Sequence, residues 1–401
     1  KLKTETSTFE CVTGYEPYEC AVDELATHNG EGTWSCSSGV TPVRKWDRWP
    51  YNVLTHDMRH VELADAALNL AMAYKLGAGD AAAQAVWDIL LEYADEYENY
   101  PRHMRDDKPD TVNFLSMAGQ ADAGRVNSQA MEEAWWLRNM AVAYDLVRDK
   151  PPNPTTSVPS PVAKVETGLL RPGAAVILSF VTPGNHQSYH NLGIVAIGLA
   201  IQDFVLVSQA YERYKWGLKY QLDTTGKWCS GGVACLNAAG AWYEGSFSYH
   251  MVALAPLVET AVFLFRTGLN LFQEAAALSN MITLPLRTMM PDTMLPRTND
   301  GLYRWLEGYG WLYEQAHSGT CRDGTCDPDA GYILSLSRDK HRTSRNYNGI
   351  LFGNNEIGNS SPPRDSVLLE NAGFAILRQE RQDDTNEGNM LYGLLKFGPH
   401  G

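Results

Sequence analysis

The sequence lacks an excess of positive charge. Its 33 Lys and Arg residues stand against 47 Asp and Glu, which gives a formal net charge of -14. Because no long-range positive field would draw a polyanion toward the protein, wholesale binding to nucleic acid or to an anionic membrane surface is excluded. An acidic polysaccharide would need a local basic patch.

An uninterrupted apolar run long enough to cross a bilayer is also missing. The longest apolar stretch, residues 251–265, carries Pro256 and Glu259. A spanning helix needs about 20 apolar residues. The chain begins at Lys1 without a charged-then-apolar leader, so we expect any secretory signal to have been removed already. The sequence predicts no membrane partner.

Cysteine is sparse, and no histidine cluster accompanies it at the spacing of a zinc knuckle. The seven cysteines include two close pairs, six and five residues apart, which favour local disulfides over a zinc site. We therefore expect an oxidising compartment and a secreted or periplasmic protein. Of the three N-terminal cysteines, one stays unpaired. The cysteines are Cys11, Cys20 and Cys36, then the pair Cys229 and Cys235, then the pair Cys321 and Cys326.

Helical periodicity fills the middle of the chain. At 401 residues the chain is longer than a single hydrophobic core accommodates, so we expect at least two packed units. Apolar residues recur every three or four positions from Trp46 to Met290. The five prolines of residues 151–161 interrupt this region with a loop. We predict an N-terminal segment 1–45, an incomplete (α/α) toroid over 46–290, and the first part of an antiparallel β-sheet domain over 291–401. Helices are expected at 63–74, 86–97, 129–147, 192–204, 248–265 and 269–281.

The texture changes after Pro291, where turn residues separate short strand-like runs such as 373–378 and 390–397. Two or three strands do not make a stable domain by themselves. We therefore expect the polypeptide to continue past Gly401, or a homodimer or second chain to complete the sheet. The predicted fold class is mainly α, an incomplete (α/α) toroid followed by the beginning of an antiparallel β-sandwich.

Three segments gather polar, titratable and aromatic groups beside predicted helix starts, where backbone amides and the helix dipole favour an anion. The first, residues 183–191, is expected immediately before an apolar helix. The second, residues 242–250, surrounds a Gly turn, and the third, residues 124–136, places two polar side chains four apart on one helical face. The candidate residues are Asn185, His186, Tyr189 and His190, then Glu244, Tyr249 and His250, then Gln129 and Glu133.

Each segment also has a purely structural interpretation. Asn185 or Ser188 would cap one helix, and Ser246 or Ser248 would cap another. Tyr249 fits a core aromatic with a satisfied hydroxyl, which is the ordinary role of such a residue at helical spacing. Glu133 fits a solvated helix face. Spacing does not decide between these interpretations and a functional site.

Taken together, the segments resemble the heparinase II/III-like polysaccharide lyases, which have an α/α toroid followed by an antiparallel β-sandwich. The resemblance runs along most of the chain. It rests on ALNLAMAYKLG, ILLEYADEY, GRVNSQAMEEAWW, AYDLV, GNHQSYHNLGIVAIGLA, WYEGSFSYHMVALAPL, LPRTNDG, NAGFAILR and LKFGPHG, in that order.

The resemblance implies a division of labour. Asn185 and His186 would bind the uronate carboxylate, Tyr249 would exchange protons with the sugar, and Gln129 and Glu133 would line the groove. Tyr189, His190, Glu244 and His250 are the further substrate-binding candidates. The family supplies another histidine, for catalysis or a metal, beyond the point where this chain stops.

Elimination gives these residue types a chemical reason. Removing the C5 proton builds negative charge on the neighbouring carboxylate, so donors placed there stabilise the transition state more than the ground state. With an ordinary pKa near 10, a tyrosine is a natural acid for the departing O4 and a poor base. For a substrate whose C5 proton and O4 share a face, Tyr249 could perform both roles. Otherwise a histidine acts as the base, either His190, His250 or the one beyond Gly401.

Two other functions stay open. A glycoside hydrolase on the same architecture would use paired carboxylates, with Glu244 beside Glu133 or Asp300. A non-catalytic glycan-binding protein would use the aromatic residues alone. No cofactor is required for elimination, and a structural Zn²⁺ or Ca²⁺ in the β domain is left open. The predicted partner is an acidic polysaccharide.

Overall fold

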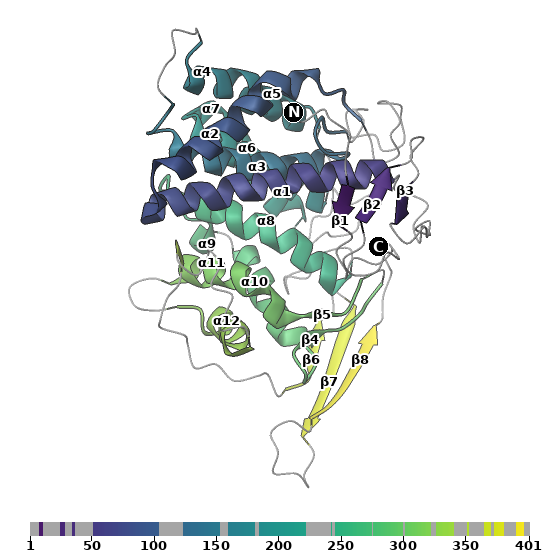
Figure 1. Ribbon diagram of the computed structural model, residues 1–401. Coiled ribbons are helices and arrows are strands. Elements are labelled where there is room, and N and C mark those ends of the chain that lie inside the picture. Colours follow the sequence, from purple (N-terminus) through teal and green to yellow (C-terminus); the bar gives the residue numbers. More distant parts are fainter. Residues whose placement is uncertain are drawn as a thin grey trace. The chain divides into compact units, whose positions relative to one another are not determined.

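The computed structural model shows a mainly helical protein with short antiparallel sheets (Figure 1). Contacts divide it into two compact units, Lys1–Phe180 and Val181–Gly401. The division falls inside the predicted toroid range 46–290, and the domain bounds stay a prediction. The structure describes residues 8–10, 25–28, 34–36, 51–103, 123–152, 159–180, 184–221, 242, 245–274, 276–299, 301–321, 326–340, 351–352, 365–369, 373–380 and 390–396.

The first unit consists of a small sheet and a group of helices. The antiparallel sheet holds β1 (Thr8–Glu10), β2 (Leu25–His28) and β3 (Trp34–Cys36) in that order. The helices are α1 (Tyr51–Ala73), η1 (Tyr74–Ala78), α2 (Asp80–Glu96), η2 (Tyr97–Asn99), α3 (Ala130–Val147), α4 (Pro161–Val165), η3 (Glu166–Leu170) and α5 (Arg171–Leu178). The start of α3 lies within one residue of its predicted start.

Aromatic residues form the core of this unit. Tyr97 stacks on Trp136 with ring centroids 6.1 Å apart, and Tyr93 meets the same indole edge-on at 4.8 Å. Their polar atoms are satisfied without water, since the Trp136 indole N–H donates to the carbonyl of His60 at 3.0 Å. All three rings are fully buried. Burial of such rings supplies much of the hydrophobic stabilisation and fixes α2 against α3.

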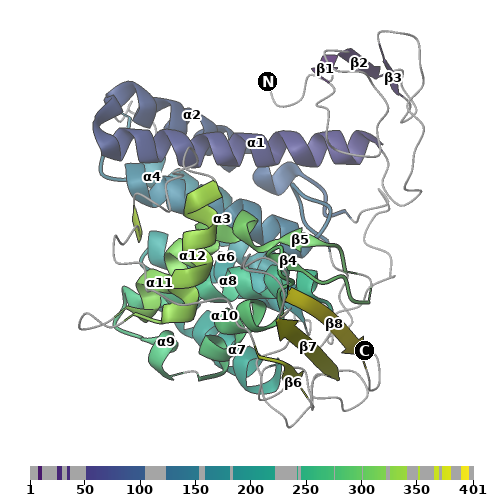
Figure 2. The ribbon, with the colours of Figure 1, turned by 90° about the horizontal axis from the view of Figure 1, so that it is seen from below.

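The second unit surrounds one apolar helix, α8 (Phe247–Phe265). Its neighbours include α6 (Asn185–Ala200), α10 (Ala276–Thr288) and α11 (Gly310–Thr320), and α10 and α11 both lie beside α12 (Pro328–Lys340) (Figure 2). Of the helices that the structure describes, α8 alone is long and apolar enough to cross a membrane, but 83% of the relevant stretch is buried inside the protein. It is therefore the core helix of this unit. The other helices are α7 (Phe204–Gln221), α9 (Leu271–Glu274) and η4 (Leu306–Tyr309).

The region after Pro291 differs from its prediction. It contains short antiparallel strands as expected, but α11 and α12 lie between its two sheets. Their apolar residues follow helical spacing, with Leu312 and Ala316 buried on α11 and Ile333 and Leu334 on α12. The Gly, Asp and Pro residues around these helices concealed that period. The sheets are β4 (Met294–Leu295) with β5 (Arg304–Trp305), and β6 (Val367–Leu369), β7 (Phe374–Glu380) and β8 (Met390–Lys396) in that order.

The three-stranded sheet is attached to the end of α10. The Arg378 guanidinium on β7 donates to the carbonyls of Arg287 and Met289 at 2.8 and 3.2 Å, and the Tyr392 hydroxyl on β8 donates to the carbonyl of Thr288 at 2.8 Å. A helix leaves its last carbonyls without intrahelical partners, and a cation there is favourable. Arg378 and Tyr392 therefore cap α10 from the sheet.

The opposite face of this sheet is apolar and exposed. Leu368, Leu377, Leu391 and Leu395 alternate with inward-facing residues, and each is more than half exposed. Such a contiguous patch is typical of a surface that another element covers. It fits the prediction that further polypeptide or a second chain completes a β-sandwich, which stays a prediction.

Cys321 and Cys326 form the predicted local disulfide, which joins the end of α11 to the segment before α12. The predicted pair Cys229 and Cys235 lies outside the described residues, as do Cys11 and Cys20.

Candidate functional site

Residues 185–191 of the predicted polar segment 183–191 form the first turns of α6 and do not precede it. Gly184 is the N-cap residue with φ 98°, a conformation that suits glycine, and the helix begins at Asn185. The cap is therefore neither Asn185 nor Ser188. Asn185 is 8% exposed, and His186 is partly exposed on the first turn. These two side chains lie where backbone amides and the helix dipole favour an anion.

Tyr189 and His190 occupy the next positions of α6. His190 is fully buried. Burial raises the pKa of the Tyr189 hydroxyl, and the nearby Tyr309 hydroxyl raises it further. Burial also raises the pKa of Tyr309, which the positive charge of Arg304 opposes. Tyr309 on η4 is therefore a neighbour of Tyr189 on α6, and Arg304 on β5 is a neighbour of Tyr309, which the sequence did not indicate.

Residues 247–250 of the predicted segment 242–250 form the start of α8. Ser246 is the N-cap residue, and its hydroxyl accepts from the backbone N–H of Tyr249 at 3.3 Å, which confirms one of the two predicted caps. Tyr249 lies on the first turn and is partly exposed. It is thus not one of the fully buried aromatic residues of α8. Glu244 lies outside the described residues.

The LPRTNDG segment is fastened to this helix start. The backbone N–H of Leu302 donates to the Ser248 hydroxyl at 3.2 Å, and the Ser246 and Ser248 hydroxyls lie 3.1 Å apart. Gly301 fits because it has no side chain, since a Cβ there would lie 2.3 Å from the Ser246 hydroxyl oxygen. Two of the segments on which the resemblance rests therefore meet at Ser246 and Ser248, and Tyr249 is the next residue along the chain.

The ends of β7 and β8 reach the same place. The ring of Phe374 packs on that of Phe247 with centroids 5.2 Å apart. The Lys396 ammonium donates to the side-chain carbonyl of Asn299 and lies 5.9 Å from the centre of the Phe374 ring. NAGFAILR and LKFGPHG thus join the other two segments. Sequence reasoning missed Lys396 and Asn299, although both lie inside the quoted segments.

Substituting Gly301 should separate these segments. The Ala Cβ would overlap the Ser246 hydroxyl, so either the cap of α8 or the bond to Leu302 has to shift. We expect Gly301→Ala to cost about 1–3 kcal/mol of stability. If the site acts on a substrate, kcat/KM should fall about 10- to 100-fold through misplacement of Tyr249. Gly308→Ala is the matched control, because a Cβ there meets nothing within 4 Å.

His250 points into the core. Its side chain is 1% exposed, and Nε2 lies 3.0 Å from the carbonyl oxygen of Met281 on α10. Burial lowers the pKa of His250 to about 4, against a weaker opposing effect of that hydrogen bond. A neutral, buried imidazole favours a packing role over the predicted substrate contact.

This histidine predicts acid sensitivity. In the folded state His250 stays neutral down to about pH 4, whereas in the unfolded chain it takes up a proton near its ordinary pKa of 6.5. Unfolding between these pH values therefore binds a proton. The contribution of neutral His250 to the free energy of unfolding is present above pH 6.5 and is lost as the pH falls from 6.5 to 4. We expect a loss of up to about 3 kcal/mol over that window. Urea unfolding of the protein and of His250→Gln at pH 7 and pH 4.5 measures it, and an equal loss in both would contradict the assignment.

In the first unit, Glu133 is enclosed by protein donors. One carboxylate oxygen accepts from the Tyr97 hydroxyl at 2.7 Å, and the other accepts from the backbone N–H groups of Val126 and Asn127 at 3.1 and 2.8 Å. The side chain is fully buried. Burial and the adjacent Glu133 charge raise the pKa of Tyr97 well above its usual value. The geometry therefore favours Glu133 as the anchor of residues 126–129 over direct contact with a sugar.

Gln129 stands at the end of that anchored segment. It is the N-cap residue of α3, with extended backbone angles and no side-chain cap bond, and it is partly exposed. We predicted that Gln129 shares one helical face with Glu133, but Gln129 precedes the helix. Its backbone carbonyl accepts from the N–H of Glu133 at 2.9 Å. Holding Glu133 in place thus also holds Gln129.

The described residues near Tyr249 include no group of three histidine, cysteine or carboxylate ligands at metal-binding distance. The second unit carries a partly exposed phenol on α8, an Asn and His pair at the start of α6, and the cations Arg304 and Lys396. Residues of these types can bind an anion and donate a proton. We find no carboxylate pair among these described residues.

Comparisons with solved structures show a shared fold. A heparinase III gene product matches with a TM-score of 0.52 at 15% identity, over 84% of this chain and 46% of that one. Heparan sulfate lyase from Pedobacter heparinus matches as wild type and as mutant with TM-scores of 0.52 and 0.53 at 14% identity, over 89% of this chain and 46% of each of those. No family model and no curated protein matches the sequence. The chain spans less than half the length of these structures, and the likeness confirms a mainly α, heparinase-like fold.

Proposed function

We propose that this chain is part of a polysaccharide lyase that cleaves a uronic-acid-containing polysaccharide by β-elimination. One observation carries the proposal: Tyr249 lies partly exposed on the first turn of α8, where the LPRTNDG loop and the ends of β7 and β8 converge. The heparinase-like fold supports it, since the similar structures are a heparinase and a heparan sulfate lyase.

The first requirement of elimination is to stabilise charge on the uronate carboxylate as the C5 proton leaves. Asn185 and His186 occupy the first turn of α6, whose backbone amides have no intrahelical acceptors. An amide donor, an imidazole donor and the helix dipole would all act on the same anion. Because the charge grows toward the transition state, these donors lower the barrier more than they tighten substrate binding.

The second requirement is a proton for O4 as the glycosidic bond breaks. Where C5–H and O4 share a face, the Tyr249 phenolate first accepts the C5 proton and becomes the phenol. The phenol then donates that proton to O4 as the glycosidic bond breaks, and the phenolate is restored for the next substrate. His190 and His250 are 0% and 1% exposed, which disfavours both as the C5 base. We therefore propose Tyr249 in both roles, on a substrate of that stereochemistry.

The hydrolase alternative loses support. Its proposed carboxylate Glu133 accepts four hydrogen bonds from described protein groups and is fully buried, so it is not available to a glycosidic oxygen in this structure. Its possible partners, Glu244 and Asp300, lie outside the described residues. No contact in the described part of the chain favours a purely glycan-binding protein over an enzyme.

A panel of polyuronates tests the proposed function. The complete protein is incubated with heparan sulfate, hyaluronan, chondroitin, alginate and ulvan, and ultraviolet absorbance of the unsaturated uronate product is followed together with new reducing ends. A lyase gives both signals in equal amounts. New reducing ends without absorbance would show a hydrolase, and tight binding without either product would show a binding protein; each would overturn the proposal.

The disulfide supports a proposal about the compartment. The Cys321–Cys326 bond supports an oxidising environment, so we propose a secreted or periplasmic enzyme whose partner is an acidic polysaccharide. The chemistry needs no cofactor, and a structural Zn²⁺ or Ca²⁺ in the β domain stays a prediction. The substrate identity among the polyuronates also follows from the panel.

A further inference from the structure

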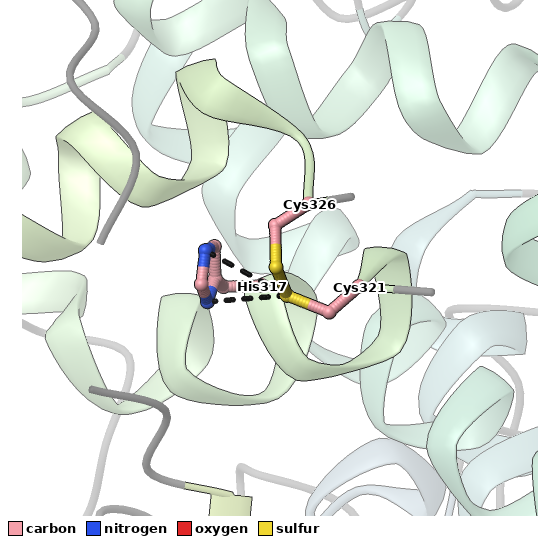
Figure 3. A group of neighbouring side chains, drawn as sticks. All are labelled: His317, Cys321 and Cys326. Atoms are coloured by element: carbon pink, nitrogen blue, oxygen red, sulfur yellow. Dashed lines mark hydrogen bonds between the residues drawn. A yellow bond between two sulfur atoms is a disulfide. The ribbon is translucent and has the colours of Figure 1, made fainter. Parts of the chain in front are cut away.

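A histidine lies against the disulfide at the end of α11 (Figure 3). The Cys321 sulfur is 3.7 Å from Nδ1 and 3.8 Å from Nε2 of His317. The ligand atoms of His317, Cys321 and Cys326 all lie within 4.8 Å of one another. Within the described part of the chain, no other group of histidine, cysteine and carboxylate side chains meets this criterion.

Helix structure holds the group without help from the S–S bond. His317 and Cys321 are four apart, so they share a face at the end of α11, and the backbone N–H of Cys321 donates to the carbonyl of His317 at 2.9 Å. Cys326 precedes Asp327, whose carboxylate accepts from the backbone N–H groups of Asp329 and Ala330 at 2.9 and 3.1 Å. That cap fixes the start of α12. Both sulfurs are thus carried by helix ends.

We propose that these three residues form a redox-controlled zinc site, in which the reduced cysteines and His317 bind one Zn²⁺. A dithiol reductant breaks the S–S bond by supplying two electrons and two protons, which leaves two thiols, and the reductant closes its own disulfide. Zinc then displaces both thiol protons, and two Zn–S bonds take the place of the S–S bond. In the reverse exchange, the disulfide form of the same reductant takes back the two electrons and, with two protons from water, returns to the dithiol, so the S–S bond of the protein re-forms and the ion is released.

The distances and the residue types fit zinc. With Zn–S near 2.3 Å and Zn–N near 2.05 Å, adjacent tetrahedral ligands lie about 3.6 Å apart, close to the sulfur to nitrogen distances found here. The same tetrahedral geometry requires the two sulfurs to move apart by less than about 2 Å from their bonded distance. Two thiolates and one imidazole leave the fourth position to water. His317 is fully buried and the cysteines are partly exposed, so the ion has an entry path on the cysteine side.

The sequence carries this site as His-x₃-Cys-x₄-Cys, residues 317–326. No histidine cluster accompanies the cysteine pairs in the linear sequence, and that spacing favours disulfides over zinc. The histidine was missed because it precedes its pair inside a helix that was itself not predicted. Helical spacing supplies the ligand that the linear pattern concealed.

Cobalt binding tests the proposal on the full chain. The protein is reduced with a phosphine, freed of reductant without oxygen, and titrated with Co²⁺. We expect one equivalent that shows a thiolate-to-cobalt charge-transfer band and the intense visible bands of a tetrahedral site, both bleached by one equivalent of Zn²⁺. Unreduced protein should show neither band.

Variants separate this site from the other five cysteines. Cys321→Ser with Cys326→Ser should remove that equivalent, while Cys229→Ser with Cys235→Ser should keep it. His317→Gln should weaken Zn²⁺ binding by more than about 100-fold, because even groups that only support a ligand are worth 10- to 100-fold. Equal binding by the protein and the Cys321 and Cys326 double variant would overturn the proposal, as would unchanged affinity in His317→Gln.

A second measurement does not depend on the fold of a variant. Reduced wild-type protein is alkylated with N-ethylmaleimide with and without Zn²⁺, and each cysteine is quantified by peptide mass spectrometry. We expect zinc to slow the modification of Cys321 and Cys326 at least tenfold. Equal rates at these two cysteines with and without the ion would refute the site.

Discussion

Tyr249→Phe is expected to lower kcat for elimination by about 10²–10⁴-fold, the usual contribution of a positioned proton donor. The change removes one oxygen and keeps the ring. The backbone N–H of Tyr249, which donates to the Ser246 cap, is unaffected. Folding and substrate binding should therefore change little, and KM should stay within a few-fold. Steady-state kinetics on the complete protein, by the absorbance of the unsaturated product, measure the effect.

The matched control is Tyr332→Phe, on α12, a half-buried tyrosine whose pKa is likewise raised by burial. It should leave kcat unchanged. Full eliminating activity in Tyr249→Phe would contradict the central role of Tyr249. A loss of kcat that accompanies a lowered urea midpoint would instead indicate a structural effect, so both variants are unfolded in parallel.

Much of the helical region could be predicted because its apolar residues repeat at helical spacing. The start of α3 and the bounds of α8 were predicted to within a residue, and β7 and β8 were found from their short apolar runs. The start of α6 was placed seven residues too late. Its first turns are polar, and the pattern registers only where apolar residues begin, at Leu192. A helix that begins at a functional site starts with polar residues, so its first turns carry no apolar repeat.

The site was only partly predictable. Tyr249 was found by its surroundings, and periodicity alone would have placed it in the core. His250 was selected as a candidate because it follows Tyr249 in the sequence, but its side chain is buried against Met281. The meeting of Asn299 with Lys396 joins residues about a hundred positions apart, and no local pattern reports such a contact. Linear motifs identify which residue types are present, whereas packing decides which of them face a substrate.

Glu133→Ala is expected to destabilise the protein by about 3–5 kcal/mol, because it strands several buried donors at once. The backbone N–H groups of Val126 and Asn127 and the Tyr97 hydroxyl all lose their acceptor. Each unsatisfied buried group costs about 1–3 kcal/mol. The segment that ends in Gln129 would lose its anchor. Urea unfolding measures the change, and Glu62→Gln, at an exposed position on α1, is the control for charge.

Glu133→Gln separates anchoring from catalysis. The amide carbonyl still accepts from the two backbone N–H groups and the amide N–H can donate to the Tyr97 oxygen, so we expect a loss of about 1–2 kcal/mol. If Glu133 is an anchor, an amide can replace its carboxylate, and the kcat of the protein on its polysaccharide should stay within tenfold. If Glu133 is a catalytic acid or base, an amide cannot replace its carboxylate, and kcat would fall by about 10²–10⁴-fold at full stability. A Glu133→Gln variant that is stable but inactive would therefore favour the paired-carboxylate hydrolase. A variant that is stable and active would exclude Glu133, which is the one carboxylate of the hydrolase alternative that lies among the described residues.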